Sequence, residues 1–578
     1  MRSSQSLLAV VLCLMAAPWA MAKTPAALPT CVPPPPPKPV QGCEYKEIDV
    51  NKYGRQPFRT VPSEFAKNGH LTTTLNVQYT DPAKTKIAGC PVTLRSYNGQ
   101  LVGPTLRIKP GDTLDIQLRN VLPRETPQQI ADQANQQICQ AHLETRPHPY
   151  NTTNLHTHGL HVSPVGNSDN VLLAISPQTS FQYEIRVPAN HPPGTYWYHA
   201  HSHGSTAIQV GSGLAGALII EDDERKLPPA LREATKREQV FLIQTLLYDN
   251  TGRVDDITAF FPDSPTTQKL CAAGKPGCTW DHSKRRTTLN GQIVPVIKMR
   301  PGEVQRWRFI DGAFRESLTL QLEGHALHEI ALDGLYLGRV DTWGPTQSIE
   351  LQPGYRSDVL IKASTKPGTY RLIDTASTAE RSIRGAAEPQ DVLAELIIEG
   401  EPMDMALPTS AEMAPLAPFP GVNLKDQAVG VQTAVYKLAQ DLAPTGTRNY
   451  FQINGHAFHP SRIRYLKLGA TDVWTVSTVG DSDAVPADKR IPPLPHVFHI
   501  HVNPFQVLRK NPAGQDEMVW RDTVLIPAGQ TVNLYTQYLD YIGQFVMHCH
   551  ILDHEDLGMM ETVEVVGDQP LSSHGAHH

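Results

Sequence analysis

Histidines gather in four short clusters whose spacing is typical of metal ligands. The clusters are HTHGLH from His156, YHAHSH from Tyr198, HVFHIH from His496 and HCHILDHEDLGM from His548. Alternate side chains of a β-strand share one face, so each H-x-H pair on a strand projects two imidazoles in one direction. The pairs can therefore supply eight converging metal ligands, which are His156 and His158, His199 and His201, His499 and His501, and His548 and His550.

The fourth cluster also predicts a second site on the opposite face of its strand. In the run H-C-H the two histidines face one way, so Cys549 between them must face the other way. A thiolate, two imidazoles and a weak axial thioether form a blue-copper electron-transfer centre. Cys549, His554 and Met559 follow one another at intervals of five residues. His496 precedes the H-x-H pair of its own strand by three residues and also faces away from that pair, so we predict that it completes this centre.

The alternatives to copper are weaker. One H-x-H pair alone is more often structural than metal-binding, but four pairs together with C-x4-H-x4-M favour a metal site. A structural zinc site needs four ligands and gains nothing from eight imidazoles beside a set of cysteine, histidine and methionine. We therefore predict that the chain binds copper.

Short strands joined by Gly and Pro turns must position these clusters. The 578 residues include 40 glycines and 50 prolines, and only 19% of them are charged. The run TLRIKPGDTLDIQL from Thr105 places apolar residues at alternate positions on both sides of a Pro-Gly turn, which indicates two strands. A related pattern begins at Asn98, at Asn290 and, in a weaker form, at Asn454. We expect an all-β protein of three related Greek-key β-sandwich domains.

The three copies of this pattern divide the chain into successive parts. The first and third parts contain the histidine clusters, and the second is expected to be a copper-free spacer. The expected parts are a signal peptide over 1–22, a Pro-rich arm over 23–44, domains over 45–225, 235–400 and 431–567, a linker over 401–430 and a His-rich tail over 568–578.

The N-terminus predicts export. Arg2, an apolar run from Leu7 to Ala17 and a small-residue cleavage site ending at Ala22 form a signal peptide, so we expect a periplasmic or secreted protein. No later stretch approaches the roughly 20 apolar residues of a membrane span, and we expect no such span in the mature chain. The net charge of −6 gives no reason to expect nucleic acid as a partner. We expect a monomer.

The cysteines suit an oxidising compartment. Once the signal peptide is removed and Cys549 is assigned to copper, six cysteines remain, an even number that could form disulfides. The sequence leaves many pairings open. The shortest loops favour Cys31 with Cys43, Cys271 with Cys278, and then Cys90 with Cys139.

The clusters and repeats resemble those of the three-domain multicopper oxidases, the family of laccases, ascorbate oxidase and bacterial spore-coat laccases. The resemblance covers residues 45–567. It implies three cupredoxin-like sandwiches and four copper ions, with a trinuclear cluster between the first and third domains. By motif position, the type 1 copper would be bound by His496, Cys549, His554 and Met559, the type 2 copper by His156 and His499, and the two type 3 ions by His158, His199, His201, His501, His548 and His550.

The same resemblance makes two carboxylates candidate proton donors. Asp169 lies 13 residues after His156, where similar oxidases keep an acidic residue beside the type 2 copper, and Glu555 follows His554 as in spore-coat laccases. Each carboxylate could instead only orient a ligand histidine. The chain departs from the family's usual Trp, Gly and Pro at Thr157, Asn170 and Val497.

These sites predict an oxidase that takes single electrons from a reductant and reduces dioxygen to water. Cys549 would receive the electrons, and its neighbours His548 and His550 would connect it to the type 3 pair. We expect a laccase-like enzyme that oxidises phenols. The alternative is oxidation of Cu(I), Fe(II) or Mn(II), for which Asp553 and Asp556 or the Met-bearing linker could hold the ion.

Other classes of protein fit less well. A cupredoxin-fold scaffold without activity should lack ligands, and this chain lacks none of them. A copper nitrite reductase needs no type 3 pair and has no second histidine after its cysteine. A role in copper storage or resistance stays open beside the oxidase activity.

Several further histidines and methionines have a simpler interpretation than metal binding. His161 could be a hydrogen-bond partner of a ligand or a surface residue, and His203 is expected at the surface. His325 and His328 have no partner cluster in their part of the chain. Three linker methionines could attract Cu(I), although packing as apolar filler is the simpler role; they are Met403, Met405 and Met413.

Overall fold

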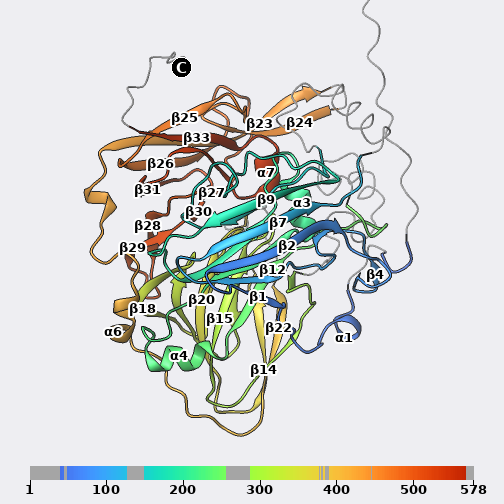
Figure 1. Ribbon diagram of the computed structural model, residues 1–578, viewed down its shortest axis with the longest axis vertical. Helices are drawn as coiled ribbons and strands as arrows, with labels where there is room; N and C mark the ends of the chain where they lie inside the picture. The colour runs from blue at the N-terminus through green and yellow to red at the C-terminus, as the bar shows by residue number, and fades with distance from the viewer. Residues whose placement is uncertain are drawn as a thin grey trace, which may run out of the picture. The chain divides into compact units, whose positions relative to one another are not determined.

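The structure, a computed structural model, describes residues 40–43, 48–125, 149–254, 287–376, 378, 382–383, 390–443, 446–487 and 489–567. Strands predominate in this part of the chain and the helices are short (Figure 1), so the all-β prediction is confirmed. No helix among these residues combines the length and the apolar character needed to cross a membrane. The predicted signal peptide and the His-rich tail lie outside the described residues.

Six larger sheets contain most of the described strands, and each sheet draws its strands from one of three successive segments. We call these the first segment (residues 63–220), the second segment (239–398) and the third segment (430–566). The first has the sheets β5-β2-β7-β9 and β1-β6-β11-β10-β8. The second has β13-β12-β15-β20-β17-β18 and β14-β22-β21-β16-β19, and the third has β24-β23-β26-β31-β28-β29 and β25-β33-β32-β27-β30. The domain bounds expected from the sequence stay a prediction.

The bounds of the elements are as follows. In the first segment they are β1 Ser63–Phe65, β2 His70–Tyr79, β3 Lys86–Ile87, β4 Cys90–Pro91, β5 Arg95–Tyr97, β6 Thr105–Ile108, β7 Thr113–Asn120, β8 His156–His158, β9 Thr179–Arg186, β10 Gly194–His199, α3 Thr206–Ser212 and β11 Ala215–Ile220. In the second they are β12 Gln239–Gln244, β13 Thr288–Leu289, β14 Val296–Met299, β15 Val304–Asp311, β16 Leu318–Leu322, β17 Leu327–Leu332, β18 Leu335–Trp343, β19 Ile349–Leu351, β20 Arg356–Lys362, β21 Gly368–Asp374 and β22 Asp391–Ile398. In the third they are β23 Gly430–Ala443, β24 Gly446–Ile453, β25 Ile463–Lys467, β26 Thr471–Val479, β27 His496–Ile500, β28 Phe505–Lys510, β29 Asp516–Arg521, β30 Thr523–Ile526, β31 Thr531–Gln537, β32 Gly543–Cys549, α7 Leu552–Asp556 and β33 Met560–Val566. Outside the segments lie α1 Val50–Tyr53, α4 Pro229–Thr235, α6 Ser410–Met413, η3 Ala414–Leu416 and η4 Leu424–Asp426.

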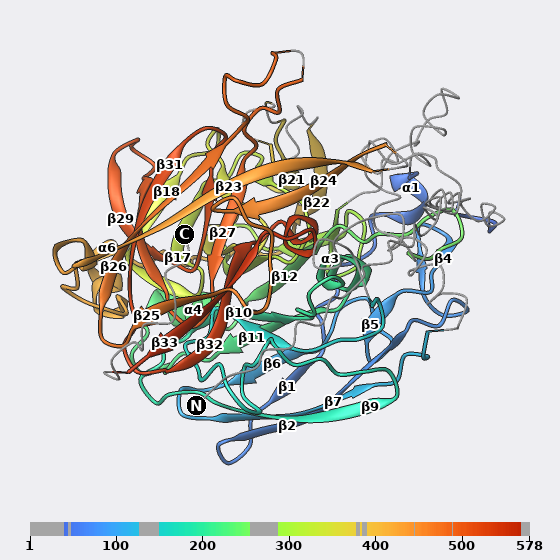
Figure 2. The same ribbon diagram turned by 90° about the horizontal axis from the view of Figure 1, so that it is seen from above.

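The three segments repeat one strand topology. In each, a first strand pairs in parallel with a second strand, and this second strand pairs antiparallel with a third. These trios are β2, β7 and β9, then β12, β15 and β20, then β23, β26 and β31. In Figure 2 the first trio runs side by side in blue and cyan. The opposite sheet of each segment also contains a parallel pair, β6 with β11, β14 with β22 or β25 with β33, and in the first segment β1 pairs in parallel with β6 as well.

The Asn-Gly pairs that mark the repeats in the sequence form the same turn each time. Asn98, Asn290 and Asn454 all have a positive φ, between 52° and 54°. The glycines that follow them also have a positive φ, between 73° and 77°. Two successive residues with positive φ form the tight turn that favours Asn-Gly. Each asparagine Oδ1 accepts a hydrogen bond, at 2.8–2.9 Å, from a backbone amide of the first parallel strand of its segment. The sequence repeat is therefore a structural repeat.

The apolar core of the first segment lies between its two sheets. Leu75 of β2 and Leu118 of β7 belong to the same buried cluster as Leu106 of β6 and Tyr198 of β10. Burial alternates along β7 as the sequence pattern predicts, because alternate side chains of a strand face opposite sides.

The expected disulfide pairing is wrong where the structure describes it. Cys43 is joined to Cys90, whereas the shortest loops had favoured Cys43 with Cys31 and Cys90 with Cys139. The reason is tertiary, because Cys43 packs beside the β3–β4 hairpin, and loop length carries no information on that contact. The other four cysteines lie outside the described residues, and they are Cys31, Cys139, Cys271 and Cys278.

Two of the three linker methionines pack as apolar filler. Met413 is fully buried in a cluster with residues of the second segment. Met405 is half-buried against the same cluster, and its Sδ accepts a hydrogen bond from the amide of Val304 at 3.3 Å. Neither sulfur is therefore placed to hold a metal ion from solution.

Candidate metal centres

The four histidine clusters lie at the ends of paired strands. β8 carries the first H-x-H pair, β10 ends at His199, β27 begins at His496 and β32 ends at Cys549. β8 pairs with β10 in the first segment, and β27 pairs with β32 in the third segment. Every ligand predicted from the sequence is buried, with an exposed fraction of 2% or less.

The eight histidines of the H-x-H pairs form overlapping groups of three. Within each group the possible ligand atoms lie within 4.8 Å of one another. A metal–nitrogen bond of about 2.0 Å places two tetrahedral ligands of one ion about 3.3 Å apart. The Nε2 atoms of His201 and His548 are 3.1 Å apart, and Nδ1 of His158 is 3.2 Å from Nε2 of His550. The groups are His158, His199 and His550, then His201, His501 and His548, then His156, His158 and His499.

Many ring nitrogens in this cluster lack a hydrogen-bond partner among the described residues. Buried polar atoms are nearly always paired, so several unpaired nitrogens in one place call for a bound ligand. Burial lowers the pKa of all eight imidazoles below the ordinary value, to about 3 for His199, which keeps them neutral and able to bind a metal. The unpaired atoms are Nε2 of His156, His199 and His499, both ring nitrogens of His501, and Nδ1 of His550.

Hydrogen bonds on the far side of the rings select the nitrogen that faces the cluster. Nδ1 of His199 donates to the carbonyl of Ala200 at 2.9 Å, and Nδ1 of His499 donates to that of Asp522 at 2.8 Å. His158 is turned the other way, because its Nε2 lies 3.2 Å from Oδ1 of Asp522 while its Nδ1 faces the cluster. Such outer partners orient metal-binding histidines.

The second site lies on the other face of β32, as the run H-C-H predicts. The Nδ1 atoms of His496 and His554 are 3.1 Å apart, and Sγ of Cys549 lies 3.6 and 3.8 Å from them. Burial raises the pKa of the Cys549 thiol to about 12, and a bound metal would replace its proton. The amide of Cys549 donates to the carbonyl of Met559 at 3.0 Å. Phe451 stacks on the ring of His554, with centroids 3.9 Å apart.

Asp169 lies directly against a predicted type 2 ligand. Its Oδ2 is 3.0 Å from Nδ1 of His156, and its Oδ1 accepts from the amide of Thr157 at 2.8 Å. The side chain is buried, and burial raises its pKa to about 7. The carboxyl can therefore both orient His156 and exchange a proton near neutral pH.

Glu555 lies between two predicted type 3 ligands. Its carboxylate oxygens are 3.5 Å from Nδ1 of His201 and 3.2 Å from Nδ1 of His548. Thr206 Oγ1 donates to Glu555 Oε1 at 3.0 Å. Burial raises the pKa of this carboxyl well above its ordinary value, so it holds a proton readily.

Sequence reasoning missed one carboxylate of the site, Asp522. It lies in the run WRDTV between β29 and β30 and touches both His158 and His499. The run has no histidine and no metal-ligand spacing, so no signal in the sequence marks it. Only the pairing of β30 with β27 brings it to the cluster.

Three histidines that are not predicted copper ligands have structural contacts. Nδ1 of His161 lies 2.8 Å from the carbonyl of Val502, and its Nε2 lies 2.8 Å from Asp540, so it links the first and third segments. His203 is half-buried, and its ring packs against a phenylalanine ring at 4.5 Å. Both nitrogens of His325 are engaged with backbone groups.

Comparisons with known proteins agree with this geometry. Sequence models of the multicopper oxidase family match residues 142–225, 253–388 and 437–569, together more than half of the chain. The chain is 25% identical over 476 residues to the multicopper oxidase mco of Staphylococcus aureus, covering 81% of this chain and 83% of that relative. It is 25% identical over 502 residues to a laccase of Bacillus subtilis, covering 82% of this chain and 90% of the laccase.

A solved structure shares the fold. A multicopper oxidase from Campylobacter jejuni, described as a metallo-oxidase, superimposes with a TM-score of 0.65 at 22% identity. The match covers 90% of this chain and 97% of that one. The prediction of a cupredoxin-like architecture is confirmed by this likeness.

Proposed function

Because the chain belongs to the multicopper oxidase family, we propose that it oxidises phenolic or similar reductants one electron at a time and reduces dioxygen to water. The family makes the chain a copper-dependent oxidoreductase. The preference for phenols and the presence of one type 1, one type 2 and two type 3 copper ions are parts of the proposal. When bound, copper would supply a one-electron acceptor at the cysteine site and a store of several electrons at the histidine cluster.

The observation that carries the proposal is that both sites share the end of β32. Cys549 faces His496 and His554, whereas its neighbours His548 and His550 face the histidine cluster. A continuous stretch of backbone therefore joins the site that would collect electrons to the site that would use them.

Buried carboxylates can supply the protons that dioxygen reduction consumes. Glu555 touches His201 and His548, and the Thr206 hydroxyl donates to its Oε1 at 3.0 Å. Asp169 touches His156 on another side of the cluster. We propose both as proton donors, each with its proton held at a carboxylate oxygen beside the ligands.

The acidic residues beside His554 do not favour a metal ion as the reductant. Asp553 is buried and pairs with Arg315 at 2.9 Å. Asp556 is buried and accepts hydrogen bonds from two backbone amides at the start of α3, at 3.1 and 2.8 Å. Neither residue presents an open carboxylate to a cation in solution.

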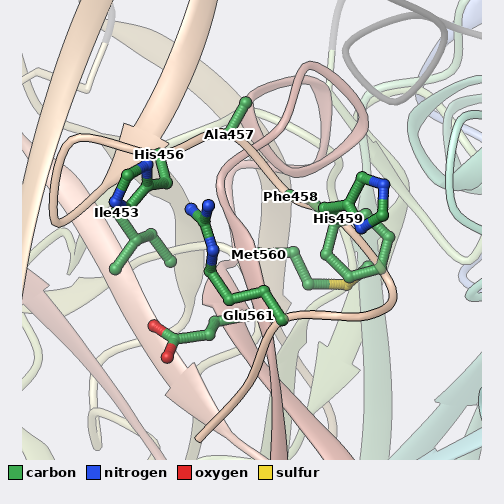
Figure 3. A pocket seen from close by; sticks show the side chains of 8 residues that line it. Ile453, His456, Ala457, Phe458, His459, Met560 and Glu561 are labelled. Atoms are coloured by element: carbon green, nitrogen blue, oxygen red, sulfur yellow. The ribbon is translucent and has the colours of Figure 1, made fainter. Parts of the chain in front are cut away.

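A small pocket at the start of β33 has room for about one water molecule, so it does not select between an organic reductant and a metal ion. Glu561 at its edge is paired with Arg464, and Arg462 adds a positive charge. The lining residues are Ile453, His456, Ala457, Phe458, His459, Arg462, Met560 and Glu561 (Figure 3).

The second candidate function is oxidation of Cu(I), Fe(II) or Mn(II). It is supported by the likeness to the Campylobacter jejuni structure, which is described as a metallo-oxidase. We rank it second because Asp553, Asp556 and Met405, the residues expected to hold the ion, are engaged elsewhere.

The test is copper loading followed by oxygen uptake. The chain is loaded with Cu(II), and its visible spectrum and oxygen consumption are measured with a phenolic donor and then with Cu(I), beside a Cys549→Ser control. A blue thiolate band with phenol-driven uptake that the control loses would support the proposal. Uptake with Cu(I) alone would favour the second candidate, and a colourless chain that takes up no oxygen would overturn both.

We also propose that the enzyme acts outside the cytoplasm, in the periplasm or the medium. The predicted signal peptide over 1–22 supports this location. Expression of the full sequence in a bacterial host, followed by fractionation and N-terminal sequencing, tests it. A cytoplasmic chain that keeps residues 1–22 would contradict it.

A further inference from the structure

We propose that Arg356, in the segment without predicted copper ligands, positions two residues of the histidine cluster by holding Asp522 against His158 and His499. The inference rests on the proposed function, because it concerns the ligands of the same cluster. It assigns the second segment a role beyond that of a spacer.

The guanidinium of Arg356 is fully buried and all its N–H groups have acceptors. Nη1 and Nη2 donate to Oδ1 and Oδ2 of Asp522 at 2.8 and 2.6 Å, a bidentate pair between the second and third segments. The remaining N–H groups donate to the carbonyls of Thr195, Asp333 and Gly354 at 3.2, 2.8 and 2.9 Å. All three segments therefore hold this side chain in place. The planar fork of arginine suits this arrangement, and the single ammonium of lysine does not.

Asp522 accepts hydrogen bonds from two histidines and thereby orients their rings. Its Oδ1 accepts a hydrogen bond from Nε2 of His158 at 3.2 Å, and its carbonyl accepts from Nδ1 of His499 at 2.8 Å. Thr523 Oγ1 donates to the same Oδ1 at 2.8 Å and lies 3.3 and 3.2 Å from the two rings. An imidazole has only two nitrogens, so the far-side bond decides which nitrogen faces the cluster.

Two glycines allow the ion pair and the second segment to approach the histidines. At Gly159, where φ is +88°, a Cβ would lie 2.4 Å from Nη2 of Arg356 and 2.6 Å from Oδ2 of Asp522. At Gly354, where φ is +90°, a Cβ would lie 3.1 Å from Nε2 of His550. Any side chain at Gly159 would push the ion pair away from β8, so this close approach requires glycine.

Loss of Arg356 would leave the Asp522 carboxylate buried without its counter-charge. Asp522 is 5% exposed, and an unpaired buried charge is costly, so the carboxylate would turn towards water and away from His158. The ring of His158 would lose the partner that orients it. Loss of such outer partners weakens metal binding by about 10- to 100-fold.

The test compares Arg356→Met with Arg306→Met in the full chain. Arg306 is an equally buried arginine of the second segment, paired with Asp358 at 2.6 Å and Asp222 at 2.7 Å, and among the described residues it contacts no predicted copper ligand. Both variants should lose thermal stability. Only Arg356→Met should bind copper at the histidine cluster about 10- to 100-fold more weakly, with its blue absorption kept. The measurements are copper per chain against a competing chelator and the electron paramagnetic resonance signal of the type 2 copper.

Further variants separate positioning from folding. Arg356→Lys keeps the charge but loses the bidentate fork, so it should fold and still lose affinity. The double variant Arg356→Met with Asp522→Asn keeps an oxygen acceptor for His158 without an unpaired charge, so it should bind copper more tightly than Arg356→Met alone.

Equal copper affinity and equal resonance spectra in Arg356→Lys, Arg356→Met and Arg306→Met would overturn the inference. A double variant no better than the single one would also contradict it. An unmodified chain that binds no copper would instead overturn the proposed function, so the two failures are distinguishable.

Discussion

The cysteine site and the histidine cluster are built in different ways. Cys549, His554 and Met559 come from one stretch of chain that runs from β32 through α7, and His496 comes from a neighbouring strand of the same sheet. The histidine cluster instead joins β8 and β10 of the first segment to β27 and β32 of the third. One site therefore depends on a single sheet, whereas the other depends on how separate segments dock.

This difference makes the histidine cluster the more sensitive site to distant changes. Its outer partners come from all three segments, as the contacts of Arg356 and Asp522 show. The cysteine site has its nearest contacts within the third segment, such as the Phe451 ring on His554. Substitutions should therefore separate the two sites, and the following predictions run from the largest expected effect to the smallest.

Cys549→Ser should abolish electron uptake while leaving copper in the histidine cluster. The serine hydroxyl cannot replace the thiolate at the blue site, but His548 on β32 and His550 directly after this strand keep their places. We expect no blue band and oxygen uptake at the level of copper-free protein. Visible spectra and copper analysis check this, and loss of all copper would show that the sites do not assemble separately.

His158→Ala should have the converse effect. The variant removes a ring that belongs to two of the histidine groups, so cluster copper and dioxygen reduction should be lost. The blue band should remain, because no atom of His158 is part of the cysteine site. Absorbance and oxygen uptake on the same sample measure both effects, and a colourless variant would contradict the separation.

Glu555→Gln and Asp169→Asn should slow oxygen reduction without removing copper. Each amide keeps the shape of the side chain but cannot donate the proton, so turnover should fall by about 10²- to 10⁴-fold. The effect should be confined to the histidine cluster, because both carboxylates touch its rings. Steady-state oxygen uptake and copper content test this, and unchanged turnover would remove the residue from the proton path.

The copper-free chain should lose stability as the pH falls below about 6.5, the ordinary pKa of histidine. Burial lowers the pKa of His199 and of His496 to about 3 in the folded state. As the pH falls, the unfolded chain therefore takes up protons before the folded chain does. The free energy of unfolding then declines by up to about 1.4 kcal/mol per pH unit for each such histidine. The histidine cluster should contribute more to this decline than the cysteine site, because it contains more buried histidines.

Urea unfolding of the copper-free chain at a series of pH values measures this dependence. His199→Ala removes one buried histidine, so the free energy of unfolding should depend less steeply on pH, by the contribution of one proton. A stability that stays constant between pH 6.5 and pH 4 would refute the prediction.

Gly354→Ala should have the smallest effect and should reach only the histidine cluster. The new Cβ would lie 3.1 Å from the ring of His550, and residue 354 has a φ of +90°. A side chain in this left-handed conformation costs about 1–3 kcal/mol. Gly421→Ala is a matched control, because φ there is +77° and nothing lies within 4 Å of its Cβ. Copper affinity should fall in Gly354→Ala alone, and equal affinities would show that the contact with His550 is relaxed without cost.

Much of the fold and the gathering of the predicted ligands at two sites could be predicted from the sequence. Alternation along a strand fixes the direction of each side chain, so the H-x-H pairs and the run around Cys549 predict two opposite sites, as the structure has them. The Asn-Gly turns at Asn98 and Asn290 likewise predict the repeat, because their conformation is local. The roles of Asp169 and Glu555 as proton donors stay predictions.

The sequence by itself therefore determined which histidines and which cysteine gather at two sites, and on which face of its strand each of them lies. Tertiary structure alone decided that Cys43 pairs with Cys90, and that Arg356 and Asp522 stand behind His158. The physical reason is distance along the chain. These contacts join residues 47 to 364 positions apart. They depend on how separate parts of the chain pack, and no local pattern of residue types records that packing.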